Sequence, residues 1–194
     1  AYHSPEVDPV QKISIISRGQ AGGYTLKIPL EDRRLATKKQ FLAELVVLMG
    51  GYVAEKVYMG DVSTGASNDL KEASELARRL VMQYGMSDKL GPISFGKSED
   101  LIFLGREITT EKNYSEKTAI EIDNEVKRLI DEATKKAEKI IKENKKQIEI
   151  LTKTLLEKEV LEKEEFEKLM EENKKNDISE TSQIKNSIAR KQNK

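Results

Sequence analysis

Apolar side chains recur every three or four positions along most of this chain, and this spacing limits its fold more than any other feature of the sequence. The pattern occupies residues 41–57, 70–81 and 119–156, and Gly60 and Gly85 follow the first two segments. Residues three and four positions apart share one face of a helix, so each segment can bury a single stripe against a neighbouring helix. The sequence therefore predicts a mainly α-helical fold.

The first helix carries its own start signal and an unusual glycine pair. Thr37, with Gln40 three positions later, has the pattern of a capping box. Inside the helix, the pair Gly50-Gly51 costs about 1 kcal/mol per glycine relative to alanine. A cost of that size predicts either a bend or close packing against another backbone.

Loops and changes in composition mark the boundaries of the later helices. After the polar loop 61–68, a second helix is predicted from about Asp69 to Tyr84. Residues 86–113 read as irregular, with two short apolar runs at 93–95 and 101–104. A long charged helix then begins after Ser115, with a break near Asn144 and a last short helix around residues 166–170.

The N-terminal region has a different pattern. The apolar run at residues 13–16 and the alternating run at residues 24–28 read as two short strands. A turn at residues 18–23 that contains three glycines separates them, and Pro29 ends the second. These features predict a small N-terminal antiparallel β-ribbon.

Charge and composition exclude several classes of protein. Lys and Arg together equal Asp and Glu at 34 each, so the net charge is zero, and no segment has the basic excess of a nucleic-acid binder. The chain has no cysteine, which rules out disulfides and thiolate chemistry. No apolar run reaches the roughly 18 residues that span a bilayer. We therefore expect this chain to be soluble and to have no nucleic-acid partner.

Five ordered blocks of sequence resemble the proteolytic domain of the FtsH family of ATP-dependent, membrane-anchored zinc endopeptidases. The blocks are residues 13–25, which resemble the pattern IIPRGxxxGxT, 29–33 (PxEDR), 48–55 (LGGRAAE), 63–69 (TTGAxND) and 84–92 (GMSxxLGP). The resemblance implies a helical metallopeptidase domain with a small β-ribbon. It divides residues 1–171, a partial peptidase domain, into an active-site half (1–110) and charged C-terminal helices (111–171). Residues 172–194, rich in Lys, Asn and Ser, are expected to be a disordered tail.

The resemblance assigns Asp69 as a protein ligand of a catalytic Zn²⁺. Such a site takes three protein ligands and leaves one position for water. The family's two histidines and general-base glutamate, in an HExxH motif, are absent from this sequence and are expected a few residues before Ala1. The resemblance therefore assigns no catalytic residue to this chain, and we expect the chain alone to be inactive. From spacing alone, Asp69 reads only as a favourable acid in the first turn of a helix.

Three further assignments follow from the resemblance. Glu55 is a candidate to orient a metal ligand from the outer shell, and a solvated helix residue is the alternative. Gly22, Gly23, Tyr24 and Thr25 are candidates to bind an extended substrate along a sheet edge, and a plain hairpin is the alternative. His3, the only histidine, reads as an ordinary side chain and not as a ligand.

The resemblance also implies the partners of the intact protein. These are unfolded or membrane protein substrates, an upstream AAA ATPase domain that binds ATP and Mg²⁺, and a homo-hexamer. The expected location is the cytoplasmic face of the bacterial inner membrane, or an organellar equivalent. The alternative function is a non-catalytic helical oligomerisation module, in which the same helices serve only to form a ring.

Overall fold

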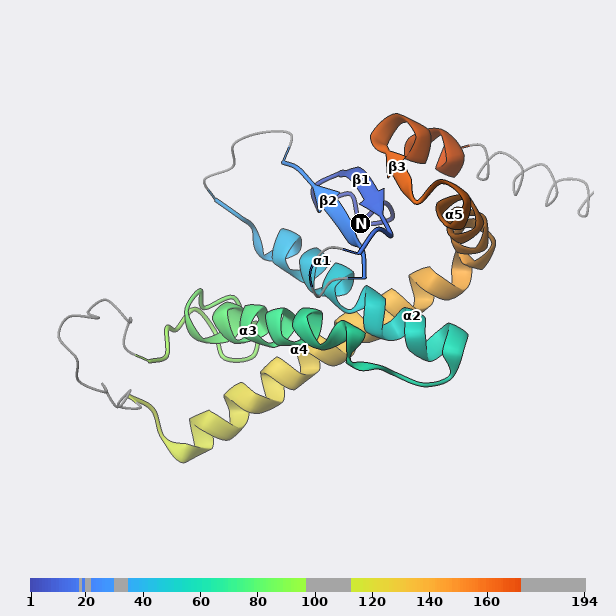
Figure 1. Cartoon of the computed structure of the whole chain (residues 1–194). Coiled ribbons are helices and arrows are strands. Elements are labelled where there is room, and N and C mark those ends of the chain that lie inside the picture. Colours follow the sequence, from blue (N-terminus) through green and yellow to red (C-terminus); the bar gives the residue numbers. More distant parts are fainter. Residues whose placement is uncertain (18, 20–21, 30–34, 97–112, 172–194) are drawn as a thin grey trace, which may run out of the picture. The chain divides into compact units, whose positions relative to one another are not determined.

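A computed structural model describes residues 1–17, 19, 22–29, 35–96 and 113–171 (Figure 1). Several expectations lie outside these residues: half of the turn 18–23, nearly all of the block 29–33, the apolar run 101–104 and the tail 172–194. The chain forms two compact units. We call residues 3–7 and 33–143 the helical unit, and residues 1–2, 8–32 and 144–194 the sheet unit.

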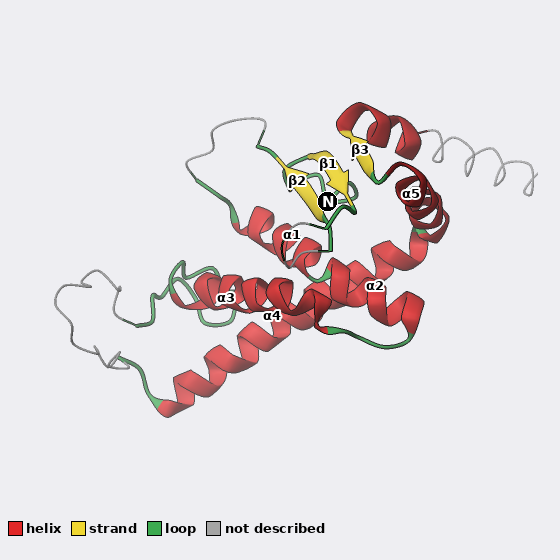
Figure 2. Ribbon diagram, viewed as in Figure 1, coloured by secondary structure: helices red, strands yellow, loops and turns green. Residues whose placement is uncertain are grey.

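The helical unit contains helices α1 (Lys38–Leu48), α2 (Gly50–Met59), α3 (Ser67–Met82) and α4 (Glu116–Glu143), with a short 3-10 turn η1 (Thr64–Ala66) before α3. The long helix α4 contacts each of α1, α2 and α3. The largest fully buried side chains of this unit include Leu45, Val53, Leu80 and Val81. Buried apolar residues of each helix thus form the core, as the helical periodicity predicts. These helices are drawn in red in Figure 2.

The start of α1 and its junction with α2 follow the sequence signals. The Gln40 amide donates to Thr37 Oγ1 at 3.3 Å, and the Thr37 amide donates to Gln40 Oε1 at 2.8 Å, which confirms the capping box. The helix is interrupted at Met49, immediately before the glycine pair, where α1 ends and α2 begins. Gly60 ends α2 in the left-handed conformation, at φ 72°.

Helix α3 begins earlier than expected. It starts at Ser67 rather than Asp69, because the turn η1 leads directly into it. Ser63 begins this turn by accepting a hydrogen bond from the Gly65 amide at its Oγ, at 3.0 Å. Ala66 is buried and holds the turn against the core. The predicted polar loop is therefore shorter, and Asp69 lies within the first turn of a helix that has already formed.

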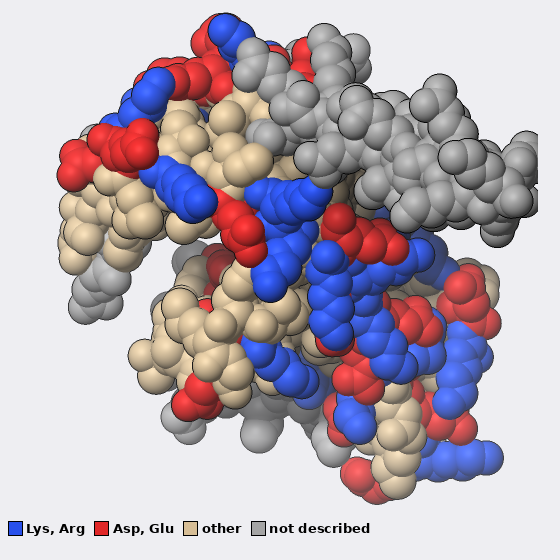
Figure 3. Space-filling model, turned by 90° about the vertical axis from the view of Figure 1, so that its right-hand side faces the viewer, with Lys and Arg blue, Asp and Glu red and all other residues tan. Residues whose placement is uncertain are grey.

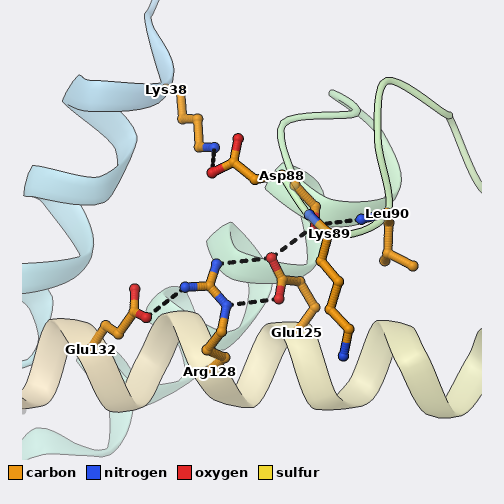
Figure 4. A network of polar contacts seen from close by, with 8 residues as sticks. Lys38, Asp88, Lys89, Leu90, Glu125, Arg128 and Glu132 are labelled. Atoms are coloured by element: carbon orange, nitrogen blue, oxygen red, sulfur yellow. Dashed lines mark hydrogen bonds and ion pairs between the residues drawn. The ribbon is translucent and has the colours of Figure 1, made fainter.

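The segment that follows α3 is fixed to α4 by polar contacts (Figure 4). Ser87 donates to the buried carboxylate of Glu125 at 2.8 Å, and its hydroxyl also accepts the backbone amides of Lys89 and Leu90, each at 3.1 Å. Arg128 donates to both carboxylate oxygens of Glu125, from Nε to Oε2 at 2.8 Å and from Nη2 to Oε1 at 2.9 Å. The buried acid Glu125 thus joins this loop to α4, in addition to the loop's backbone hydrogen bonds to α3.

The sheet unit has three antiparallel strands in the order β2-β1-β3: β1 (Val10–Ser14), β2 (Tyr24–Lys27) and β3 (Val160–Glu162). The first two form the predicted ribbon, although β1 lies at residues 10–14 and not 13–16. Helix α5 (Lys145–Lys158) follows the predicted break at Asn144, and residues 163–171 form the predicted last helix. The strand β3 between these helices was not predicted.

The core of the sheet unit joins segments from both ends of the chain. Its buried residues are Val10, Leu155, Leu161, Phe166 and Met170, with Ile13, Leu151 and Leu169 packed around them. The ring of Tyr2 packs edge-on against Phe166, with 5.6 Å between ring centroids. The N-terminal ribbon therefore rests on the C-terminal helices.

The surface is charged but not of one sign. On the face drawn in Figure 3, blue basic and red acidic side chains lie beside one another. Several are neighbours on one helix turn, such as Lys142 with Glu138 at 2.6 Å. None of the helices that the structure describes is long and apolar enough to cross a bilayer.

Candidate metal and substrate site

Asp69 lies where the starts of two helices come together. It is in the first turn of α3 and is only partly exposed. Its Oδ2 atom is 3.6 Å from the position that a Cβ atom would take on Gly51, in the first turn of α2. This is an ordinary van der Waals distance to a side chain, so the close backbone packing predicted at the glycine pair is not found at Gly51, and Gly50 has no neighbour within 4 Å of such a position.

Glu55 holds the turn that leads to Asp69. One carboxylate oxygen accepts the Ser63 amide at 2.6 Å, and the other accepts the Ser63 hydroxyl at 3.0 Å. Gly65 passes close by, since a Cβ atom there would lie 3.1 Å from Glu55 Oε1 and from Ser63 Oγ. Glu55 thus joins α2 to the beginning of η1. Ser63 was not singled out from the sequence, although a serine two residues before a glycine in a polar loop is typical of a turn start.

These residues fit a metal ion only as part of a ligand set. A carboxylate oxygen is a normal zinc donor, and Asp69 is held between two helix starts. Within the described parts of the chain, no three His, Cys, Asp or Glu side chains come together to hold a metal ion. His3 is exposed, as expected for an ordinary side chain. The described residues thus present one carboxylate, Asp69, beside a turn that Glu55 supports, and no complete ligand set.

The residues predicted to bind substrate lie at or just before the start of β2. Tyr24 and Thr25 pair with Ser14 and Ile13 of β1, and no described strand pairs with the other edge of β2. Gly23 is required by a close approach, because a Cβ atom there would lie only 2.6 Å from the Ser14 carbonyl oxygen. The glycine therefore lets the chain enter β2 tightly against β1.

The direction of the backbone N–H and C=O groups alternates along β1, and this alternation determines which backbone groups of β2 point away from β1. In antiparallel strands the N–H and C=O of one residue point to the same side, and successive residues alternate. The Ile15 amide donates to the Glu159 carbonyl at 3.0 Å, so Ile15 and Ile13 face β3, while the Ser14 carbonyl faces β2. Thr25 lies opposite Ile13, so its own N–H and C=O point away from β1. The edge of β2 thus presents backbone groups to an incoming strand.

Comparison with known sequences places this architecture among the peptidases. A sequence model of peptidase family M41 matches residues 1–169, which is most of the chain. The chain belongs to peptidase family M41.

Several relatives carry one name, ATP-dependent zinc metalloprotease FtsH. The protein of Caldicellulosiruptor bescii is 51% identical over 166 residues, which cover 86% of this chain and 27% of the relative. The FtsH 1 protein of Thermomicrobium roseum is 51% identical over 168 residues, covering 87% and 26%. The protein of Bacillus subtilis is 48% identical over 155 residues, covering 79% and 24%. The chain thus spans about a quarter of the length of these relatives.

Proposed function

We propose that this chain is part of an ATP-dependent zinc metalloendopeptidase, in which Asp69 is one of the protein ligands of the zinc. The observation that carries the proposal is the position of Asp69, opposite Gly51 in a chain of peptidase family M41. The names of the relatives support zinc and ATP dependence for the intact protein. The other ligands and the general base come from parts of that protein outside this sequence.

Each described residue of the site has a separate role. Asp69 supplies a carboxylate oxygen, Gly51 leaves room for it, and Glu55 fixes the turn from which α3 starts. When bound, the zinc would lower the pKa of a water molecule and polarise the scissile carbonyl. An anchored ligand is what a catalytic metal requires, since supports of the first ligands commonly change metal affinity or activity 10- to 100-fold.

The substrate would bind along the open edge of β2. An extended polypeptide can add to such an edge through main-chain hydrogen bonds, which tolerate many side chains. That tolerance suits unfolded or membrane protein substrates delivered by an AAA ATPase domain, which would use ATP and Mg²⁺. In the intact protein we place this domain in a homo-hexamer at the cytoplasmic face of the bacterial inner membrane, or in an organellar equivalent.

The test is the substitution Asp69→Ala in the intact protein. We expect the zinc content per subunit, measured by mass spectrometry, to fall well below one, and casein hydrolysis to be lost. The matched control is Asp61→Ala, which removes an exposed acid from the α2–α3 connection whose hydrogen bond is to the Val62 amide. The control should keep both zinc and hydrolysis.

Full zinc content and unchanged casein hydrolysis after Asp69→Ala would refute the ligand assignment. If the unsubstituted intact protein neither binds zinc nor cleaves casein, the alternative of a non-catalytic helical oligomerisation module is favoured instead.

A further inference from the structure

The strand β3 is connected through β1 to the strand whose outer edge is proposed to bind substrate. Each residue from Lys12 to Ser14 pairs with one residue of β2 on one side and one of β3 on the other. Three rows therefore cross the sheet: Leu26–Lys12–Glu162, Thr25–Ile13–Leu161 and Tyr24–Ser14–Val160. The two candidate substrate-binding residues of β2, Tyr24 and Thr25, share rows with Val160 and Leu161.

The middle row is the best anchored. Leu161 is completely buried, in the core formed with Leu155 and Phe166. Ile13, its partner in the row, packs against the same core. The backbone N–H and C=O of Ile13 point toward β3, as those of Ile15 do, because groups alternate along a strand. The backbone N–H and C=O of Thr25, which lies opposite Ile13, point away from β1. The position of Thr25 therefore depends, through Ile13, on Leu161.

The end of α5 sets where β3 begins. Glu159 closes the helix in the left-handed conformation at φ 62°, with its amide bonded to the Leu155 carbonyl at 2.7 Å. In that conformation its carbonyl accepts the Ile15 amide at 3.0 Å, which extends the pairing of β1 beyond the strand. An ion pair at 2.6 Å between Lys12 and Glu162 closes the other end.

We propose that Leu161, with the strand β3 that it anchors, is a positioning residue for substrate binding at the edge of β2. This inference rests on the proposed function. A β2 strand paired only with β1 would be half of a two-stranded ribbon, which is marginally stable in water. With β3 in place, β1 becomes a central strand backed by a core, and the outward groups of Thr25 are held ready for an incoming strand.

The experiment uses Leu161→Ala in the intact protease, and Leu161→Val as a milder variant in case the first does not fold. Removing part of a fully buried leucine weakens its anchor, so amide hydrogen exchange in residues 10–14 and 24–27 should rise by about tenfold or more. The KM for labelled casein should rise, while kcat and the zinc content stay unchanged. A role in the metal site would change kcat or zinc instead.

The matched control is Leu129→Ala, an equal deletion in the core of the helical unit. It should lower stability without raising either hydrogen exchange in β1 and β2 or the KM for casein. An unchanged KM in both Leu161 variants, or unchanged exchange in β1 and β2, would overturn the positioning role.

The substitution Thr25→Pro tests the substrate-binding edge of β2 separately from the role of Leu161. The proline removes an outward N–H from β2, whereas Thr25→Ala keeps it. If Thr25→Pro raises the KM and the Leu161 variants do not, only the role of Leu161 is refuted. If Thr25→Pro also leaves the KM unchanged, the substrate edge itself is wrong and the role of Leu161 is lost with it.

Discussion

At the scale of single residues, Glu55 shows how one side chain can fix the start of a helix to which it does not belong. Both of its oxygens are used by Ser63, one by the amide and one by the hydroxyl. Hydrogen bonds to a charged group contribute about 1.5–3 kcal/mol each, more than neutral ones. This carboxylate therefore helps to hold the turn that carries the chain into η1 and on to Asp69, together with the Gly65–Ser63 hydrogen bond and the buried Ala66.

We expect Glu55→Ala in the intact protein to lower zinc affinity or casein hydrolysis by roughly 10- to 100-fold, because the turn before Asp69 loses its anchor. Glu55→Gln should lose less, since an amide oxygen still accepts one of the two bonds. Zinc titration and initial rates measure both effects. The control is Glu75→Ala, an exposed acid farther along α3. Equal behaviour of Glu55→Ala and Glu75→Ala would exclude a supporting role for Glu55.

At the scale of elements, the loop after α3 depends on an acid inside α4 (Figure 4). The Glu125 side chain has no exposed surface, and its partners come from two elements: Arg128 on its own helix and Ser87 on the loop. The hydrogen bonds from Arg128 hold the pKa of the Glu125 carboxyl below its ordinary value of 4.5, although burial opposes the shift. Arg128 also bonds Glu132 at 2.5 Å, which keeps its guanidinium in place.

Replacing Glu125 by alanine should destabilise the folded chain by about 1–3 kcal/mol, because the buried Ser87 hydroxyl loses its acceptor, while the half-exposed Arg128 keeps Glu132 as a partner. Since the folded state lowers this pKa, the stabilisation is present above pH 4.5 and is lost as the pH falls through the folded value. The gap in melting temperature between the native chain and Glu125→Ala should therefore be wide at pH 7 and narrower near pH 3. A gap that does not change with pH would contradict this account.

The elements also show what the sequence could predict. The amphipathic helices, the capping box at Thr37 and the break at Asn144 follow from local patterns, because each depends on residues within two or three turns. The strand β3 does not. Its three residues stand between charged helical segments without a turn signal, and only pairing with β1 makes them a strand. Tertiary context decides such short segments.

The candidate site divides in the same way. Motif resemblance singled out Asp69, Glu55 and residues 22–25, and the structure gives each a position. The resemblance could not supply the link from Glu55 to Ser63, because that contact depends on how the loop folds back on α2. Nor could it tell which backbone groups of β2 face outward, because a shift of one residue in register reverses every group.

At the scale of the whole molecule, the proposed metal ligand belongs to the helical unit and the proposed substrate edge to the sheet unit. Each unit has its own core, and each takes residues from distant parts of the sequence. The helical unit brings residues 3–7 together with residues 33–143, and the sheet unit combines both ends of the described chain. The proposed function therefore requires both units to be folded.

We expect the 194-residue chain by itself to bind well under one zinc ion and to leave casein intact, because its described residues assemble no three metal ligands. Zinc content after gel filtration and a casein assay measure this directly. Added zinc should also leave the melting temperature unchanged, since a ligand that does not bind cannot stabilise the folded state. Stoichiometric zinc together with casein cleavage would show that the chain holds a complete site.

The pairing of Lys12 with Glu162, 150 positions later, has a consequence for biosynthesis. A ribosome that adds 5–20 residues per second needs roughly 8–30 s to make the intervening chain. During that interval the nascent ribbon can form but has neither its third strand nor its C-terminal core. Strand β1 is thus made long before its pairing is completed, and a chaperone would meet it with the edge that later pairs with β3 still open.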